Sequence, residues 1–260
     1  MEVVIAPTPA DVAVIASQAI ERVLTSKPHP VLGLATGSSP LGVYAELIKR
    51  HRAGLSFAHV RAFLLDEYVG LAPAHPEAYR AFIEREFTSQ IDLPAGALHG
   101  PDGNEETLAT AAARYESQIE AAGGVDLQIL GIGSDGHIGF NEPGSSLGSR
   151  TRLKTLTEDT RRDNARFFDG NVDAVPRHVL TQGIGTILDS GHLLMIAPGE
   201  SKAGPIAAAV EGPITATVPA SALQLHPHTT VIIDEAAAGQ LERADYYREA
   251  YANKPDWQEI

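Results

Sequence analysis

The sequence contains no cysteine and only two methionines among its 260 residues. Disulfide bonds, thiolate metal sites and cysteine nucleophiles are therefore excluded. The chain also lacks an apolar run near the ~20 residues of a membrane span, and its first residues lack the basic start of a secretory signal. These features favour a cytoplasmic protein without a membrane partner.

Positive charge is scarce, because 20 Lys and Arg residues stand against 33 Asp and Glu residues, giving a net charge of −13. Non-specific binding to nucleic acid or to an anionic membrane draws on excess Lys and Arg, so neither is expected. An anionic ligand would need a local basic pocket.

Apolar runs that fit strands alternate with helical stretches over the whole chain, and no linker divides residues 1–260. The runs lie at 30–35, 60–65, 125–131, 192–197 and 229–234, and the helical stretches at 41–52, 76–87, 105–122 and 201–210. Several runs are apolar on both faces, which is typical of buried strands in a parallel sheet. The pattern predicts a single-domain, doubly wound, Rossmann-like α/β fold, with a mostly parallel sheet and helices on both faces.

Ligands of such sheets bind beyond the carboxyl ends of the strands, so the loops after the runs are examined first. The loop after 30–35 contains Thr36, Gly37, Ser38 and Ser39, followed by a proline. We expect Ser39 to cap the next helix, with the proline at its first position. Hydroxyl groups, an open backbone and a helix N-terminus suit a phosphate, although a plain capping turn is the alternative.

Basic residues that could assist such a site occur in two places. Lys202 falls in the first turn of a predicted helix, where the helix dipole disfavours a cation unless a bound anion compensates it. The segment 150–166 holds six of the 20 basic residues. Arg161 and Arg162 are expected on a solvated helical face. Anion-binding roles are plausible for Arg152, Lys154 and Arg166.

Two acidic residues, Asp66 and Glu67, directly follow the run 60–65. A carboxylate at the end of a buried strand is partly desolvated, which raises its basicity and suits it to take a proton from carbon. A helix cap or a salt-bridged acid is the alternative reading for this pair.

The loop 131–144 combines five glycines with two acids and one imidazole. Asp135 and His137 are two residues apart, and a carboxylate beside an imidazole fixes its tautomer and stabilises its protonated form. Glu142 can join them across a tight turn. So many glycines are costly in backbone entropy, which favours a functional loop.

Two other kinds of site are not expected. The glycines of 131–144 are followed by a proline rather than a helix, so nicotinamide binding is rejected. His226 and His228 have no nearby carboxylates to complete a ligand set, so no zinc site is predicted.

With these residues identified, the sequence resembles the glucosamine-6-phosphate deaminase family, also called glucosamine-6-phosphate isomerases, over essentially its full length. The resemblance rests on residues 34–41, 65–70, 75–79, 131–146, 149–152, 180–185 and 223–227. Family members convert D-glucosamine 6-phosphate and water to D-fructose 6-phosphate and ammonia in amino-sugar catabolism. The resemblance therefore implies aldose–ketose isomerisation with deamination, without a cofactor or a metal.

The resemblance also assigns roles by position. Asp66 corresponds to the base that moves the C2 proton to C1, and His137 to the ring-opening acid–base group held by Asp135 and Glu142. The phosphate-binding positions are matched by Thr36, Gly37, Ser38, Ser39, Arg166 and Lys202. A mobile lid is expected around residues 150–181.

Regulated members of the family are hexamers that bind N-acetylglucosamine 6-phosphate at a subunit interface, whereas other members are unregulated monomers. The effector positions are matched by Ser145, Arg152 and Lys154. Allosteric control and a homo-oligomer are therefore hypotheses. Aromatic residues between 246 and 257 fit either the packed face of a last helix or a subunit contact.

Three alternatives remain open. 6-Phosphogluconolactonases share the expected fold and an Asp-Gly-His loop, but a lactonase needs no base at C2. A sugar-phosphate-sensing regulator would carry a DNA-binding module, and no basic helix-turn-helix is present. A deaminase for galactosamine 6-phosphate, the C4 epimer, cannot be distinguished by sequence.

Overall fold

The computed structural model describes residues 1–72, 74–255, 257–258 and 260. The strands are β1 Glu2–Ala6, β2 Val31–Leu34, β3 Arg61–Leu64, β4 Asp66–Tyr68, β5 Leu98–His99, β6 Leu127–Leu130, β7 Arg152–Thr155, β8 His178–Thr181, β9 Leu193–Ile196 and β10 Thr229–Asp234. The α-helices are α1 Pro9–Ser26, α2 Leu41–Arg52, α3 Tyr79–Glu86, α4 Leu108–Ala121, α5 Glu158–Asn164, α6 Ile184–Leu188, α7 Ala203–Val210 and α8 Ala244–Ala252. Short 3-10 helices are η1 Thr88–Gln90, η2 Glu105–Thr107, η3 Ala165–Phe167, η4 Val172–Ala174, η5 Glu200–Lys202 and η6 Pro219–Leu225.

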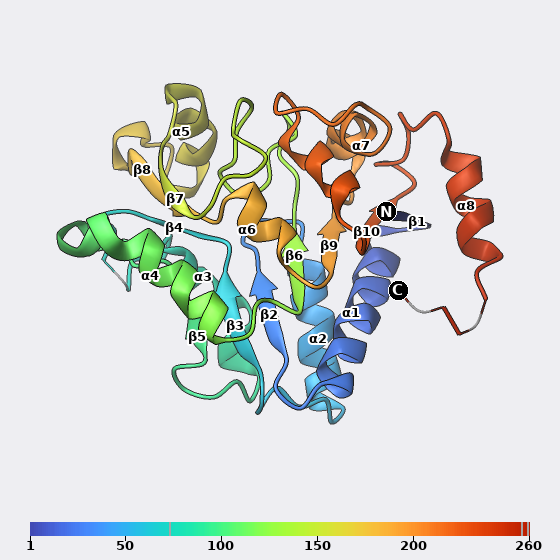
Figure 1. Cartoon of the computed structure of the whole chain (residues 1–260), viewed down its shortest axis with the longest axis horizontal. Helices are drawn as coiled ribbons and strands as arrows, with labels where there is room; N and C mark the ends of the chain where they lie inside the picture. The colour runs from blue at the N-terminus through green and yellow to red at the C-terminus, as the bar shows by residue number, and fades with distance from the viewer. Residues whose placement is uncertain (73, 256, 259) are drawn as a thin grey trace.

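A seven-stranded sheet in the order β1-β10-β9-β6-β2-β3-β5 forms the centre of the molecule (Figure 1). All of its strand pairs are parallel. Each of the five predicted apolar runs contains one of its strands. The edge strands β1 and β5 were not among the predicted runs.

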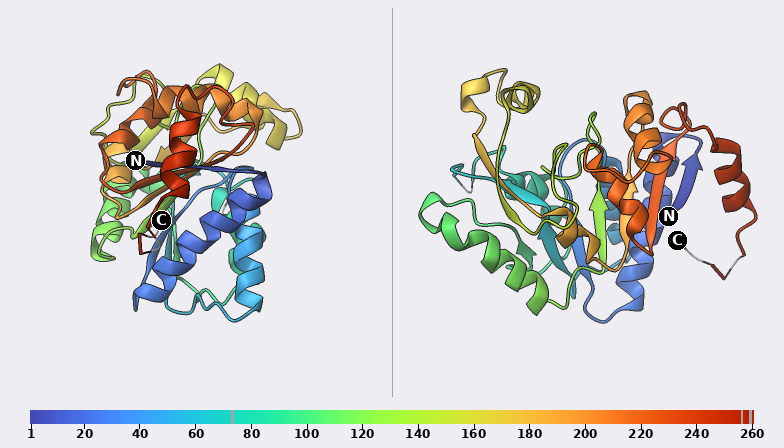
Figure 2. Two further views of the ribbon diagram at one scale, coloured as in Figure 1. Left: turned by 90° about the vertical axis from the view of Figure 1, so that its right-hand side faces the viewer. Right: turned by 45° about the horizontal axis from the view of Figure 1, so that its top comes forward.

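Helices cover both faces of this sheet, as expected for a doubly wound fold. Viewed along the sheet, α1 and α2 lie on one side and α4 lies on the other (Figure 2). Strands β2, β6, β9 and β10 are buried along their whole length. This burial explains why their sequences are apolar on both faces. The predicted fold class is confirmed.

A second, three-stranded sheet in the order β4-β8-β7 lies beside the first and is antiparallel. Sequence analysis did not predict it. Strand β4 follows β3 after a single residue, Leu65, and β7 alternates half-buried with exposed residues rather than forming an apolar run. Its strands are defined by their pairing, which is a tertiary contact that a local pattern does not reveal.

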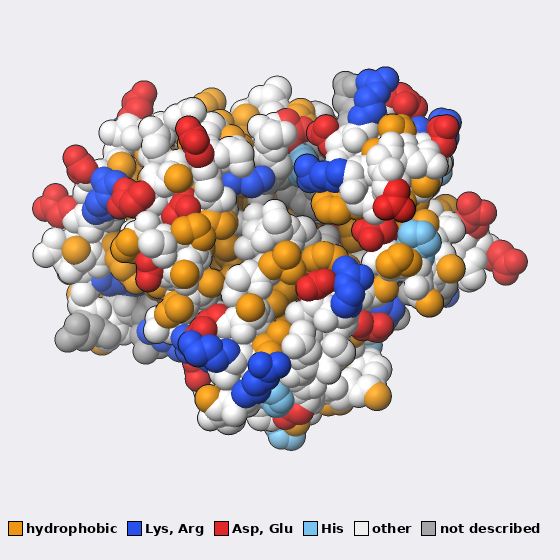
Figure 3. Space-filling model, turned by 180° about the vertical axis from the view of Figure 1, so that it is seen from behind, with side chains coloured by type: hydrophobic (Ala, Val, Ile, Leu, Met, Phe, Trp, Pro, Cys, Tyr) orange, Lys and Arg blue, Asp and Glu red, His pale blue; other side chains and the backbone are white. Residues whose placement is uncertain are grey.

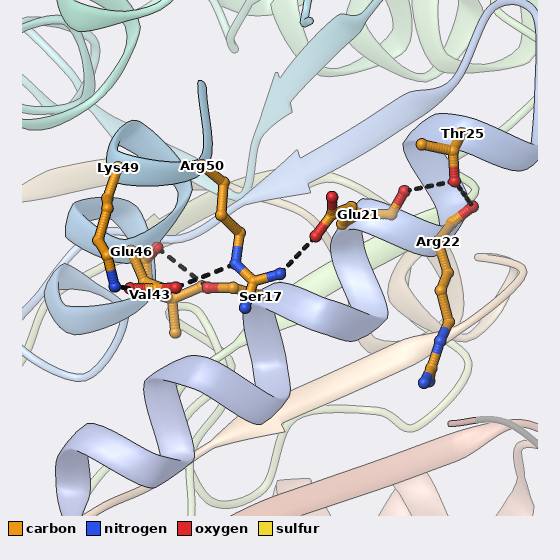
Figure 4. Close-up of polar contacts among 8 residues, drawn as sticks. All are labelled: Ser17, Glu21, Arg22, Thr25, Val43, Glu46, Lys49 and Arg50. Atoms are coloured by element: carbon orange, nitrogen blue, oxygen red, sulfur yellow. Dashed lines mark hydrogen bonds and ion pairs between the residues drawn. The ribbon is translucent and has the colours of Figure 1, made fainter. Parts of the chain in front are cut away.

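Helices α1 and α2 are joined by a network of charged side chains (Figure 4). Arg50 of α2 pairs with Glu21 of α1 and, at 3.1 Å, with Glu46 one turn earlier on its own helix. Basic residues occupy the last turn of α2, where their positive charge interacts favourably with the negative end of the helix dipole. The network fixes α2 against α1, and α2 in turn points its N-terminus at the carboxyl end of the sheet.

The C-terminal helix α8 packs beside the edge strand β1 (Figure 1). Tyr247 and Tyr251 pack against the main core, while Tyr246 and Trp257 are exposed. Lys254, just beyond the helix, pairs with Glu2 of β1 at 2.7 Å. The aromatic residues of this segment are thus divided between core packing and the surface. Among the described residues, no helix is long and apolar enough to cross a membrane.

One close approach in the centre of the sheet depends on a glycine. Gly33 of β2 is paired with Gln128 of β6, and the fully buried Gln128 side chain occupies the space above Gly33. A Cβ atom at position 33 would lie 1.9 Å from Gln128 Oε1. Gln128 Nε2 donates to the carbonyl of Ile129 at 2.9 Å, whereas Oε1 has no hydrogen-bond partner among the described residues.

We predict that Gly33→Ala lowers the free energy of unfolding by about 1–3 kcal/mol, because the added methyl group overpacks this site. Gln128→Ala in the same chain should recover part of that loss by removing the clash. Urea unfolding of the two single variants and the double variant measures the coupling. Additive losses would show that the loss in Gly33→Ala does not come from contact with Gln128.

Candidate active site

Four loops meet at the carboxyl edge of the four neighbouring strands β9, β6, β2 and β3. A Cβ atom at Gly131, after β6, would lie 3.8 Å from the Ser39 side chain, so the loops after β6 and β2 are in contact. Seen from behind, Lys or Arg side chains stand on two sides of a hollow in the upper part of the molecule, with a histidine beside it (Figure 3).

The N-terminus of α2 carries no side-chain cap. Pro40 is its N-cap residue, with φ −82° and ψ −9°, and α2 begins at Leu41. The expected cap by Ser39 and the expected place of Pro40 inside the first turn are therefore wrong. The first N–H groups of α2 are left without a side-chain cap, next to the half-buried Thr36, Gly37 and Ser39 and the exposed Ser38. An uncapped helix start of this kind suits an anion.

Two cations approach the same region from different elements. Lys202 of η5 donates from Nζ to the carbonyl of Ile132, after β6, at 2.7 Å. Burial, and then the charge of Arg166 on η3, lower the pKa of Lys202. A bound anion would relieve the repulsion between Lys202 and Arg166, so the pair suits a phosphate.

The loop that carries Lys202 is held by Asp234, which sequence analysis missed. Asp234 ends β10 and is buried, and its Oδ1 accepts hydrogen bonds at 2.9 Å from the N–H groups of Gly199 and Ala237. Gly199 has φ 98°, which glycine adopts without strain. An acid at the end of a buried run is the sequence signal that indicates Asp66, and the same signal is present at Asp234.

Asp66 and Glu67 have different environments. Glu67 accepts hydrogen bonds from the backbone N–H groups of Tyr68, at 2.8 Å, and of Tyr79 and Arg80, at 2.9 Å, so it caps α3. The capping alternative therefore applies to Glu67. Asp66 is 5% exposed. Burial, followed by the charge of Glu67, raises the pKa of Asp66 well above its usual value. The expected desolvation of Asp66 is confirmed.

His137 and Asp135 form a hydrogen-bonded pair. His137 Nδ1 lies 2.6 Å from Asp135 Oδ1, which also accepts the His137 backbone N–H at 3.1 Å. Since a carboxylate only accepts, the proton lies on Nδ1 and leaves Nε2 to exchange protons. The imidazole lies against Gly133, where a Cβ atom would be 2.1 Å from His137 Cε1.

Glu142 lies across the loop, and its carboxylate accepts a hydrogen bond from Thr160 of α5. The contact expected between Glu142 and His137 stays a prediction. The backbone around Glu142 is fixed by two bonds to β8 and its end, from Phe140 N to Thr181 Oγ1 at 3.1 Å and from Asn141 Nδ2 to the carbonyl of Gln182 at 2.8 Å. Since Thr181 is paired with Asp66, β8 joins the histidine loop to the strand of Asp66.

The residues that match effector positions lie near this junction. Arg152 of β7 donates to Asn141 Oδ1 at 2.8 Å, and burial lowers its pKa. Lys154 is two residues further along β7 and is half-buried. Ser145 is buried, and its hydroxyl has no hydrogen-bond partner among the described residues.

Arg161 and His226 are both held by hydrogen bonds to backbone carbonyls. Arg161 is 3% exposed and donates to the carbonyls of Val172 and Val175, so a solvated face is wrong for it, whereas Arg162 is exposed. His226 Nε2 bonds the carbonyl of Ser190 at 2.7 Å. No group of three or more His, Cys, Asp or Glu residues in the described part of the chain is arranged to hold a metal ion.

The chain is similar to known proteins in sequence and in fold. A sequence model described as glucosamine-6-phosphate isomerases/6-phosphogluconolactonase matches residues 8–232. The chain belongs to this family. A glucosamine-6-phosphate deaminase of Beutenbergia cavernae is 61% identical over 259 residues, covering 99% of both chains. One from Mycolicibacterium smegmatis is 57% identical over 261 residues, covering all of both chains.

Solved structures show the same relationship. A structure described as a monomeric glucosamine-6-phosphate deaminase is 42% identical and has a TM-score of 0.89, covering 92% of this chain and 100% of that one. A 6-phosphogluconolactonase from Trypanosoma cruzi has a TM-score of 0.74 at 19% identity, over 93% of this chain and 97% of that one. The lactonase shares the fold alone.

We predict that Asp66→Asn is more stable than the wild-type chain by about 1–3 kcal/mol near pH 8, because it removes a buried charge. The folded-state pKa of Asp66 is raised, so the folded wild-type chain takes up a proton as the pH falls and its disadvantage shrinks toward pH 5. Urea unfolding at both pH values measures the difference. Asp163→Asn, at an exposed carboxylate of α5, is the control.

Proposed function

We propose that the chain catalyses the conversion of D-glucosamine 6-phosphate and water to D-fructose 6-phosphate and ammonia. The observation that carries this proposal is the buried carboxylate of Asp66, whose pKa is raised, joined through β8 to the loop of the Asp135–His137 pair. A group that takes a proton from carbon must be a stronger base than an ordinary carboxylate, and burial has this effect.

The phosphate end of the substrate is assigned to the uncapped start of α2, with Lys202 and Arg166 supplying charge. Thr36, Gly37, Ser38 and Ser39 contribute backbone N–H groups and hydroxyls. Because a phosphate dianion and the carboxylate of Asp66 repel each other, the cations must hold the phosphate away from the reacting carbons. Binding at this end positions the sugar for the chemical steps.

Ring opening is assigned to His137. The unprotonated Nε2 takes the proton of the C1 hydroxyl, and the imidazolium returns a proton to the ring oxygen as the C1–O bond of the ring breaks. Asp135 stabilises the imidazolium, since Asp135 Oδ1 is bonded to Nδ1. Glu142 adds negative charge to the same side of the site.

Isomerisation and deamination then follow on the open chain. Asp66 removes the proton from C2 while a proton passes from the ammonium nitrogen to the aldehyde oxygen, which gives an enolamine. The protonated Asp66 then returns its proton to C1, and the nitrogen at C2 becomes an iminium. Water adds to the iminium carbon, and the C2–N bond breaks to give fructose 6-phosphate and ammonia. General acid–base groups of this kind contribute roughly 10²–10⁴-fold each.

Lactone hydrolysis is the alternative within the family. A lactonase requires attack by water at a carbonyl and has no need of a base aimed at C2. The deaminase names of the relatives that are more than half identical favour the first activity. The deep burial of Asp66 is accounted for by proton removal from carbon and not by lactone hydrolysis.

We further infer that segment 150–181 closes over the site as a lid and that the enzyme works in the cytoplasm. The segment carries Arg166 toward the phosphate and Thr160 toward Glu142, so its position affects both ends of the site. A sugar phosphate does not cross a lipid bilayer unaided, so the enzyme must share a compartment with the kinase or transporter that supplies its substrate.

We also propose that N-acetylglucosamine 6-phosphate binds near Ser145, Arg152 and Lys154, in a homo-oligomer. Without the effector, we expect the rate to depend sigmoidally on the substrate concentration. With the effector, we expect the substrate concentration that gives the half-maximal rate to fall. Sedimentation with and without the effector, beside steady-state kinetics, measures both properties. Hyperbolic kinetics in a monomer that ignores the effector would rule this out.

The reaction is tested by coupling ammonia release to fructose 6-phosphate formation, with EDTA present and with galactosamine 6-phosphate as a parallel substrate. We expect metal-independent turnover of the glucosamine substrate. Asp66→Asn should abolish exchange of the C2 hydrogen with solvent and leave substrate binding nearly intact. Release from neither sugar, together with hydrolysis of 6-phosphogluconolactone, would favour the lactonase.

A further inference from the structure

A chain of hydroxyl groups leads from α5 to Glu142. The Thr160 hydroxyl donates its single proton to Glu142 Oε1. Thr160 Oγ1 also lies 2.9 Å from the hydroxyl of Thr157, the N-cap of α5, which must then be the donor between the two. The Thr160 backbone N–H donates to Thr157 Oγ1 at 3.2 Å. Both the position and the proton direction of the Thr160 hydroxyl are therefore fixed by the start of α5.

The same stretch of chain reaches the phosphate end. Helix α5 continues directly into η3, which carries Arg166 six residues after Thr160. The charge of Arg166 acts on Lys202. One short helical stretch thus places a hydroxyl on a carboxylate of the histidine loop and a guanidinium beside the phosphate lysine.

This stretch is anchored by its own packing. Ala165 and Phe168 are buried in an aromatic cluster with Tyr68 and Phe140, and the rings of Tyr68 and Phe168 meet edge to face at 5.8 Å. Arg161 ties α5 to the chain around η4. The stretch from α5 to Phe168 is a packed unit, so a movement of Arg166 also moves Thr160.

We propose that Thr160 is the positioning residue through which segment 150–181 orients Glu142 for ring opening. The inference rests on the proposed deaminase function. A free glutamate side chain samples several rotamers, and the Thr160 hydroxyl selects one of them.

Thr160→Val tests this proposal, since valine keeps the branched shape and removes the hydroxyl. We expect kcat for glucosamine 6-phosphate to fall by roughly 5- to 20-fold, the effect of losing a hydrogen bond to a charged group that must be aligned. KM and the inhibition constant of inorganic phosphate should change less than twofold. Thr160→Ser, which retains the donor, should restore most of kcat.

Two further variants separate positioning from general damage. Thr155→Val removes a hydroxyl from β7 that contacts His178 at 3.3 Å and no catalytic group, so kcat should stay unchanged. Lys202→Ala should show the opposite split, with a raised KM and weaker phosphate inhibition. Thermal unfolding of each variant confirms that the fold is retained.

A double-variant cycle identifies the group through which Thr160 acts. In the Glu142→Gln background, Thr160→Val should lower kcat less than twofold further, because the carboxylate that it positions is gone. Three results would each overturn the inference: an undiminished kcat in Thr160→Val, failure of Thr160→Ser to restore kcat, or an equal loss in the Glu142→Gln background. If the wild-type chain still turned over glucosamine 6-phosphate, the proposed deaminase function would stand. A wild-type chain without deaminase activity would overturn both.

Discussion

The site depends on one costly arrangement, which is the carboxylate of Asp66 held almost without solvent at the junction of two sheets. Its neighbour Glu67 is also buried and its pKa is also raised, but its carboxylate accepts hydrogen bonds from three backbone N–H groups and caps α3. These hydrogen bonds offset part of the cost of burying Glu67, whereas burial and the charge of Glu67 raise the pKa of Asp66 well above its usual value. Such destabilised groups are common where chemistry takes place, and the surrounding core must supply the stability.

The second arrangement is the separation of charge along the site. The chain as a whole carries −13, yet Lys202 bonds the loop after β6 and lies within the electrostatic reach of a second cation, Arg166. An excess of negative charge elsewhere disfavours anions at the rest of the surface, which supports the proposed phosphate site. Segment 150–181 spans this separation, since it carries both Thr160, which bonds Glu142, and Arg166, whose charge acts on Lys202.

Sequence reasoning identified the five inner strands of the main sheet because they are buried on both faces, and missed the edge strands β1 and β5. It indicated Asp66 because an acid follows one of those runs. It failed where a contact between distant segments decides the outcome. The sequence around Arg161 predicts a surface residue, yet Arg161 is buried and donates hydrogen bonds to the carbonyls of Val172 in η4 and of Val175 just after it. Ser39 fits a helix cap by type, but α2 starts one residue later than that cap requires. The hydrogen bond between Thr160 and Glu142 joins residues 18 positions apart, and no local pattern predicts it.

The pairing of β8 with both β4 and β7 has a consequence for how this protein can change over evolutionary time. A shift of one residue in the pairing of β8 with β4 would turn the side chains of β8, Thr181 opposite Asp66 among them, to the other face of the sheet, because side chains alternate along a strand. Insertions in the connection between β7 and β8 leave that pairing unchanged, because the connection leaves and re-enters the sheet through two strands that are themselves paired. An insertion within β8 would disrupt it.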